Sequence, residues 1–318
     1  MTSTDPARQE VAALPLDTWF PEETTLEEDL KRHWGDWGVA SEVDTLRAVL
    51  MHRPGGEIDG VDPKVARFTE EPLDPELFRR QHDALAQVYR DHGVTVHYVG
   101  ETRPDRPNAV YTRDLLFMTP EGAIVGRPGM SARRGEERYL AAALARLGVP
   151  IILTVHGDGL FEGANAMWVD RRTVVLSTSS RCNRAGYDQV AQALGRMGVD
   201  TIIPMQVPST NIHIDGVLNM AADDVAVVHA QQVPYDVCDA LRRKGIKVLG
   251  VPLSSEVYQN FCCNFVALES GVVVQPDGSP RCREMLEQNG IKVIPVDLSE
   301  VVKGRGAVHC CTAFLKRG

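Results

Sequence analysis

The stretch YLAAALARLGVPIILT, residues 139–154, joins an amphipathic helix to a glycine and a short β-branched strand. Apolar residues recur in its first half at i, i+3 and i+4, which is typical of one buried stripe. Gly148 stands where a left-handed residue ends a helix without a Cβ penalty. The same arrangement occurs in ALAQVYRDHGVTVHYV (84–99), VAQALGRMGVDTIIPM (190–205), VCDALRRKGIKVLGVP (237–252) and CREMLEQNGIKVIPVD (282–297). The chain is therefore predicted to contain five similar α/β modules.

Another strand is expected before each of these helices. It lies in AVLMHRPGG (48–56), AIVGRPGM (123–130), TVVLSTSS (173–180), VAVVHAQQ (225–232) and GVVVQPDG (271–278). The five helix-ending glycines are 45 to 55 residues apart, which is the spacing of a structural repeat. Each module is thus predicted to run strand, loop, helix, strand, loop and a further strand.

Polar and reactive residues recur where the last strand of each module begins. The five starts are YTRDLLFM (111–118), EGANAMWV (162–169), HIDGVLNM (213–220), FCCNFVAL (261–268) and HCCTAFLK (309–316). In each of them, four variable residues precede a mostly apolar tail. Modules related by rotation would bring these starts together, so the sequence predicts one site at a common centre.

Composition limits the classes of function. The chain has 318 residues, of which 43% are apolar and 24% charged, as expected for a soluble globular protein. A net charge of −9 argues against a broad nucleic-acid-binding surface but allows a local basic pocket for a small anion. No apolar run is long enough to span a membrane, and the N-terminus lacks the pattern of a secretory signal.

Seven cysteines, an odd number without CxxC spacing, argue against a disulfide framework or a zinc site. They favour reduced thiols and a cytoplasmic protein.

Residues 1–40 stand outside the repeat and are predicted to form an N-terminal extension to a single catalytic domain, residues 41–318. The extension is acidic and contains Trp19, Trp34 and Trp37, and TTLEEDLKRHW (24–34) is predicted to be helical. We expect it to dock against the body or against a partner subunit. A homodimer is therefore a hypothesis to test.

The strand starts together offer Asp114, Glu162, His213, Asp215, and either Cys310 or Cys311. A cysteine nucleophile needs a histidine to shuttle protons and a group such as a carboxylate to orient that histidine. The remaining carboxylates suit a planar cation with several N–H donors, a guanidinium or an amidinium. Taken singly, each residue has a structural alternative, such as a buried ion pair of Asp114 with Arg113 or a core histidine at position 213. Cys262 and Cys263 have no acid or histidine beside them and are interpreted as packing.

These residues resemble the motifs of the guanidino-group-modifying enzymes of the pentein α/β-propeller fold, and most closely the arginine deiminases. The similarity runs from about Ser41 to Gly318. SEVDTLRAVLMHRPG (41–55) looks like the opening strand, PNAVYTRD (107–114) resembles P-N-x-x-F-T-R-D, and FEGAN (161–165) is similar to E-G-G-D. HID (213–215) matches H-x-D, and GRGAVHCCT (304–312) resembles G-R-G-G-G-H-C-M-T. The resemblance implies a propeller of five ββαβ modules around a central active site.

The resemblance also implies a role for each matched position. Cys310, rather than Cys311, would be the nucleophile, with His213 as proton shuttle and Glu162 supporting that histidine. Asp114 and Asp215 would bind the guanidinium. At the substrate carboxylate, the resemblance implies Asn108 together with Arg133 and Arg181, each of which lies 19 residues after a motif acid. Arg305 from the last loop and Asn165 would complete the substrate-binding residues.

Three departures from the deiminase pattern stand out. Asn165 occupies the position of an aspartate, which removes a charge next to Glu162. Ala307 and Val308 replace a Gly-Gly pair, so the nucleophile loop is expected to be stiffer. The chain also has no room between Asp114 and Glu162 for the helical subdomain that most bacterial arginine deiminases carry.

The sequence therefore predicts an enzyme without cofactor or metal that acts on L-arginine or a close derivative through a covalent amidino-thioether on Cys310. Hydrolysis to citrulline and ammonia is the preferred outcome. An amidinotransferase that passes the amidino group to an acceptor amine and releases ornithine is the alternative. A non-catalytic binder of arginine or a peptide is the third hypothesis. No D-x-H-x-D cluster of a metal-dependent ureohydrolase is present. Beyond small molecules, no nucleic-acid or membrane partner is expected.

Overall fold

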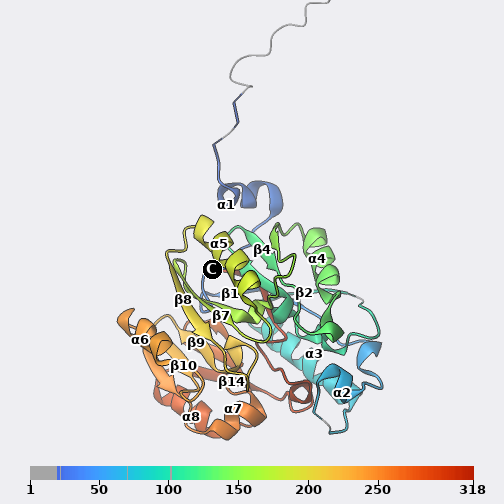
Figure 1. The fold of residues 1–318 in the computed structure, drawn as a ribbon. Helices are drawn as coiled ribbons and strands as arrows, with labels where there is room; N and C mark the ends of the chain where they lie inside the picture. Colours follow the sequence, from blue (N-terminus) through green and yellow to red (C-terminus); the bar gives the residue numbers. More distant parts are fainter. Residues whose placement is uncertain (1–19, 22, 70, 101) are drawn as a thin grey trace, which may run out of the picture.

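The structure is a computed structural model that describes residues 20–21, 23–69, 71–100 and 102–318. Its described part contains five three-stranded sheets (Figure 1). In spatial order they are β15-β1-β2 (Ala313–Arg317, Leu46–Met51, Thr95–Tyr98), β3-β4-β5 (Leu116–Thr119, Gly122–Val125, Ile151–Thr154), β6-β7-β8 (Ala166–Asp170, Thr173–Thr178, Thr201–Gln206), β9-β10-β11 (Leu218–Ala222, Val225–Val228, Lys247–Gly250) and β12-β13-β14 (Val266–Glu269, Val272–Pro276, Lys292–Val296). The predicted five-module architecture is confirmed.

Each sheet combines an antiparallel pair with a parallel crossover through one helix. The crossover helices are α3 (Pro75–Asp91), α4 (Glu136–Leu147), α5 (Arg184–Arg196), α6 (Tyr235–Arg243) and α8 (Pro280–Gln288). Helices α4, α6 and α8 lie at the periphery in Figure 1, with the strands further inside. The five glycines predicted to end these helices adopt left-handed φ angles between 75° and 85°. A side chain with a Cβ rarely adopts this conformation, which explains why glycine recurs there.

The two ends of the repeat meet in the first sheet. Strand β15, the last of the chain, pairs antiparallel with β1, and β1 pairs parallel with β2. The last strand start, at Cys310, is thereby brought beside the first, where the backbone N–H of Arg113 donates to the carbonyl of Cys310 at 3.0 Å. This closure places the C-terminal cysteine motif next to the motif of residues 107–114.

Two short helices were not predicted. α2 (Pro63–Ala66) has only four residues and α7 (Ser254–Asn260) has seven, too few to show a helical period in the sequence. Helix α2 begins with the Asp62 carboxylate accepting the backbone N–H of Lys64 at 2.9 Å.

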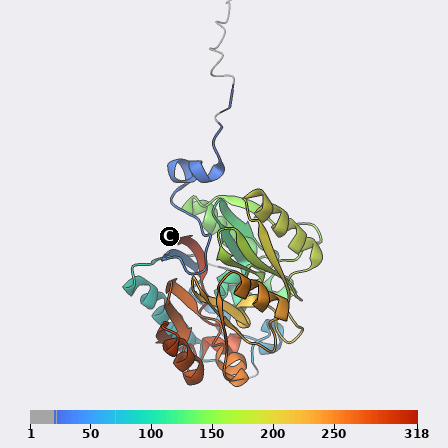
Figure 2. The same ribbon diagram turned by 90° about the vertical axis from the view of Figure 1, so that its left-hand side faces the viewer.

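The predicted N-terminal helix is present as α1 (Leu26–Asp29), which continues into a wider turn over Leu30–Trp34. Thr25 caps it through a reciprocal pair of hydrogen bonds with Glu28. Figure 2 shows this helix at one end of the body. The following residues run onto the body: the Gly38 N–H donates to the Leu315 carbonyl at 2.9 Å, and Val39 is buried. Trp19 lies outside the described residues, and the domain boundary at residue 40 stays a prediction.

Among the described residues, none of the helices has the length and apolar character that crossing a membrane requires.

Candidate active site

The starts of the last strands converge. Three of them form short 3-10 turns, Thr112–Leu115, Gly163–Asn165 and Ile214–Gly216. Gly163 allows the close approach, since a Cβ there would lie 2.3 Å from the carbonyl oxygen of Leu116. A cavity of about 690 Å³ opens onto these turns, and its wall includes Asn108, Asp114, Arg133, Glu162, Arg181, His213, Arg305 and Cys310. Eight of the ten predicted site residues therefore line one pocket.

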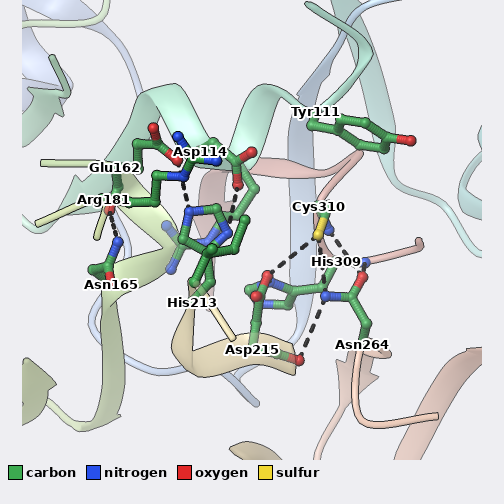
Figure 3. Close-up of polar contacts among 12 residues, drawn as sticks. Tyr111, Asp114, Glu162, Asn165, Arg181, His213, Asp215, Asn264, His309 and Cys310 are labelled. Carbon is green, nitrogen blue, oxygen red and sulfur yellow. Dashed lines mark hydrogen bonds and ion pairs between the residues drawn. The ribbon is translucent and has the colours of Figure 1, made fainter. Parts of the chain in front are cut away.

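His213 and Glu162 form a buried pair at this pocket (Figure 3). The His213 Nε2 lies 2.7 Å from the Glu162 Oε2, and the second carboxylate oxygen accepts the backbone N–H of Gly129 at 3.0 Å. On its other side, the His213 Nδ1 lies 3.5 Å from the Asp114 Oδ1. Burial opposes a charged imidazole, but Asp114 and Glu162 outweigh it and hold the pKa of His213 above its ordinary value. The two carboxylates therefore shift His213 toward the imidazolium, which is the form that a general acid needs.

Cys310 supplies the thiol. Its side chain lines the cavity, whereas the adjacent Cys311 is fully buried behind it and does not line the cavity. The Cys310 Sγ lies 3.7 Å from the Asp215 Oδ2. Burial, then the negative charges of Asp215 and Asp114, raise the pKa of this thiol well above its usual range. A cation placed among these carboxylates would reverse that electrostatic effect and favour the thiolate.

Asp215 does not line the cavity and is held from behind by a histidine. The His309 Nδ1 lies 2.8 Å from the Asp215 Oδ2, and its Nε2 lies 3.3 Å from the Glu42 Oε2. Burial acts against a charged His309, but the two carboxylates raise its pKa above the ordinary value. The sequence analysis missed both His309 and Glu42. The only signal for His309 was its place directly before Cys310 in the quoted motif.

Arg133 is placed differently from its predicted role as a ligand of the substrate carboxylate. Its buried guanidinium donates to the Asp114 Oδ2 and to the Glu136 Oε2, and also to the backbone carbonyls of Asn108 and Tyr111, both at 3.1 Å. Two buried carboxylates need a cation close by, and Arg133 is that cation. Burial, partly offset by Arg133, raises the pKa of Glu136 to about 7. The Asp114 Oδ1 has no hydrogen-bond partner among the described residues, and it faces the His213 Nδ1 at 3.5 Å.

The other predicted substrate-binding residues fall into two groups. Asn108, Arg181 and Arg305 line the pocket, and neither arginine forms an ion pair within the described part of the chain. Asn165, by contrast, lies behind Glu162 and not on the cavity wall. Its Oδ1 accepts the hydroxyls of Ser177 and Ser179 at 2.8 and 2.9 Å. The structure thus gives Asn165 a supporting position in place of the predicted contact with substrate, because these two hydroxyls satisfy its amide oxygen.

The nucleophile loop is fixed by close packing. A Cβ on Gly304 would lie 2.0 Å from the Tyr111 hydroxyl oxygen, and one on Gly306 would lie 2.5 Å from the Tyr111 ring. Arg305 between them has a left-handed φ of 65°. Ala307 and Val308, which replace the glycine pair of the deiminase motif, are fully buried.

The fourth module contributes a residue that the sequence analysis passed over. Cys262 and Cys263 are fully buried, in line with their interpretation as packing. Asn264, the next residue, reaches the site, and its Nδ2 lies 3.2 Å from the Cys310 Sγ. Its position at a strand start was the signal that could have found it.

Asp114, Glu162 and His213 also lie close enough together to hold a metal ion. In the structure their polar atoms already bind Arg133 and one another.

A thiol and an imidazole–carboxylate pair that line one pocket, carried on five α/β modules, are those of a pentein of the class that modifies guanidino groups. The comparisons with known proteins name the family. The sequence model described as "N,N dimethylarginine dimethylhydrolase, eukaryotic" matches residues 69–317, and the chain belongs to this family.

Individual relatives are distant but span most of the chain. The N(G),N(G)-dimethylarginine dimethylaminohydrolase of Streptomyces coelicolor is 24% identical over 271 residues, which is 85% of this chain and 97% of the relative. The arginine deiminase of Limosilactobacillus reuteri is 20% identical over 400 aligned residues, which cover 88% of this chain and 97% of the relative.

Two solved structures share the fold. A mutant of the Pseudomonas aeruginosa dimethylarginine dimethylaminohydrolase, complexed with citrulline, has a TM-score of 0.71 at 21% identity, and the match covers 85% of this chain and 99% of that chain. An amidinotransferase from Microseira wollei has a TM-score of 0.69 at 16% identity, with 88% and 97% covered. The predicted membership of the guanidino-modifying superfamily is confirmed.

Proposed function

We propose that this protein hydrolyses the guanidino group of L-arginine, or of a close derivative such as a methylated arginine, to citrulline and an amine. One observation carries the proposal: Cys310, the His213–Glu162 pair and Asp114 open on the same pocket. The names of two relatives, a dimethylarginine dimethylaminohydrolase and an arginine deiminase, support hydrolysis at a guanidinium. Ammonia is the amine released from arginine, and dimethylamine is the amine released from dimethylarginine.

The pocket offers groups for both ends of such a substrate. Two buried oxygens on its wall, the Asp114 Oδ1 and the Asn108 Oδ1, have no hydrogen-bond partner among the described residues and suit the N–H groups of a guanidinium. Lys64, Arg67, Arg181 and Arg305 line the same cavity, in a protein of net charge −9. Cations gathered at one pocket of an acidic protein favour a substrate with a carboxylate.

The reaction follows from these placements. The substrate cation lies against Asp114, with Asp215 behind the sulfur, and its charge lets the Cys310 thiol ionise and release its proton to solvent. The thiolate attacks Cζ and forms an S–C bond. His213 donates its proton to the leaving nitrogen as the C–N bond breaks, which leaves an amidino-thioether. His213 then takes a proton from water, and the hydroxide attacks the same carbon. The S–C bond breaks as the new hydroxyl loses its proton to solvent, which releases citrulline and the thiolate.

Mass spectrometry of products tests the proposal. We expect the protein to convert guanidino-¹⁵N-arginine to citrulline and labelled ammonia, or dimethylarginine to citrulline and dimethylamine, with no amine added. Absence of both products in a correctly folded protein would contradict hydrolysis of these substrates. Labelling with 2-chloroacetamidine then separates the other hypotheses, since a non-catalytic binder would show no selective modification of Cys310.

A specific feature keeps the amidinotransferase as the second candidate. A larger cavity of about 820 Å³ shares Ile212 and Arg305 with the active-site pocket. It holds none of the catalytic groups, but Glu71, Asp277 and Asp297 line it, and carboxylates suit a cationic acceptor amine. Ornithine that appears only when a primary amine such as glycine or lysine is added, together with the amidinated amine, would establish transfer.

Arg181 provides a prediction about substrate binding. Replacing Arg181 with glutamine should raise KM for arginine about 10- to 100-fold, because a hydrogen bond to a charged group is worth about 1.5–3 kcal/mol. KM for agmatine, which lacks the carboxylate, should stay unchanged. Steady-state kinetics with both compounds measures the difference. Arg184→Gln is the matched control, since Arg184 is exposed and pairs with Asp188 away from the pocket. Equal losses for arginine and agmatine would remove Arg181 from the carboxylate site.

A further inference from the structure

The side-chain amide of Asn264 lies against the nucleophile and uses all four of its hydrogen-bonding positions (Figure 3). Its Oδ1 accepts the backbone N–H groups of His309 and Cys310 at 3.0 and 3.2 Å. Its Nδ2 donates to the Cys310 Sγ at 3.2 Å and to the Asp215 carbonyl at 3.4 Å. Two backbone donors must face the amide oxygen, so the network fixes the NH₂ group toward the sulfur.

We propose that Asn264 is a catalytic residue of this site, which stabilises the Cys310 thiolate through its Nδ2–H while its Oδ1 holds the backbone that aims the sulfur. The inference rests on the proposed function, since it requires Cys310 to react as a thiolate. Asn264 is 1% exposed, so water does not compete for these bonds. It lies two residues before β12, the last strand of the fourth module, which among the described residues otherwise contributes no reactive group to the site.

The electrostatics around the sulfur show why such a donor is needed. Burial raises the pKa of Cys310 most, and the carboxylates of Asp215 and Asp114 raise it further, whereas a backbone hydrogen bond with Ala307 lowers it. His309 contacts Asp215 and Glu42, and His213 faces Asp114 and Glu162. Within the described part of the chain, Asn264 is the only side chain that donates a hydrogen bond to this sulfur. A neutral N–H donor favours the thiolate without attracting the substrate's carboxylate.

Two substitutions separate the donor from the acceptor. Asn264→Asp keeps an oxygen for both backbone N–H groups but removes the donor and adds a negative charge. Asn264→Ala removes both functions. Asn219→Ala is the matched structural control, because buried Asn219 donates to the carbonyls of Cys263 and Phe265, on either side of Asn264, without touching Cys310.

The measurement is the rate of Cys310 alkylation by iodoacetamide against pH, with peptide mass spectrometry to separate Cys310 from the other six cysteines. We expect the apparent pKa of Cys310 to rise by about one unit or more in Asn264→Ala and further in Asn264→Asp. Below that pKa, alkylation should be about tenfold slower, and kcat should fall about 10²-fold, as when one preorganised donor is removed. Asn219→Ala should keep the wild-type alkylation profile even if its Tm is lower.

The outcomes are distinguishable. The added charge of Asn264→Asp raises the pKa by itself, so Asn264→Ala decides the role of the donor: a wild-type alkylation profile in Asn264→Ala would overturn the proposal. A shift in Asn219→Ala equal to that in Asn264→Ala would also overturn it. The alkylation assay needs no substrate, so a wild-type protein that turns over neither arginine nor dimethylarginine would refute the proposed function and leave the titration able to decide the role of Asn264.

Discussion

Replacing Cys310 with alanine is expected to lower kcat for guanidine hydrolysis by about 10⁵- to 10⁶-fold, the scale of loss when a covalent nucleophile is removed. No other group on the pocket wall can form the S–C bond, because the thiol of Cys310 is the only one among the described residues that line it. Isotope-labelled turnover followed by mass spectrometry provides the sensitivity that this loss requires. Arginine binding, measured by calorimetry, should be retained because Asp114, Asn108 and Arg181 are unchanged.

Cys311→Ala is the natural control for this variant. The two cysteines are adjacent and of the same type, but Cys311 is fully buried and its carbonyl accepts the Thr112 hydroxyl at 3.2 Å. We expect Cys311→Ala to keep turnover within a few-fold of wild type and to lose only packing stability. The reverse result, an active Cys310→Ala and an inactive Cys311→Ala, would move the nucleophile by one residue and contradict the proposed chemistry.

The repeat could be predicted from the sequence because each of its parts is determined by residues close together in the chain. A helix stripe, a glycine with left-handed φ and a β-branched strand each depend on neighbours within about ten residues. Gly148 and Gly245, for example, show the expected left-handed φ angles of 75° and 85°. The closure of the first sheet by β15 could not be read in this way, because it joins residues 46–50 to residues 313–317.

The site was predicted in composition but not in its internal bonding. The reactive residue types were visible at the strand starts, since few other functions place a cysteine, a histidine and three carboxylates at equivalent positions. The partners of those residues come from elsewhere in the chain. Glu42 and His309 are in contact although they lie 267 residues apart in the sequence, and Asn264 and Cys310 are in contact although they lie 46 residues apart. Such contacts depend on how modules pack, which no local pattern reports.

Arg133 is a second case in which the sequence placed a residue near the pocket but did not give its contacts. Its spacing of 19 residues from Asp114 correctly indicated an arginine near the pocket. Spacing does not say where a flexible side chain points. The presence of buried Glu136 three residues later decides that question, since two carboxylates with one arginine between them bind it more tightly than solvent does. We therefore propose that Arg133 orients Asp114 through one carboxylate oxygen and leaves the other for the substrate.

Glu162→Gln is expected to lower kcat/KM by about 10²- to 10⁴-fold, the range for losing an effective general acid–base group. The reason lies in His213, whose pKa is raised by the carboxylates of Asp114 and Glu162 against the effect of burial. Glutamine keeps a hydrogen-bond partner for the imidazole but removes the charge that favours the imidazolium. Because His213 must be protonated to act as the acid, activity falls as pH rises through its pKa, and that limb of the profile should move to lower pH in the variant.

The raised pKa of His213 should also make the stability of the fold depend on pH, with the same direction as the activity. A histidine whose pKa is higher in the folded than in the unfolded protein stabilises the fold below its unfolded value, near 6.5, and this contribution is lost as pH rises through the folded pKa. Urea unfolding of wild type should therefore show stability falling over that window, and Glu162→Gln should show a smaller fall.

Glu57→Gln is the control, since His52 and Glu57 form a similar buried pair at 2.9 Å, with neither residue on the active-site pocket wall. Glu57→Gln should keep the pH profile of kcat/KM, and an equal shift in both variants would mean that the profile does not report His213.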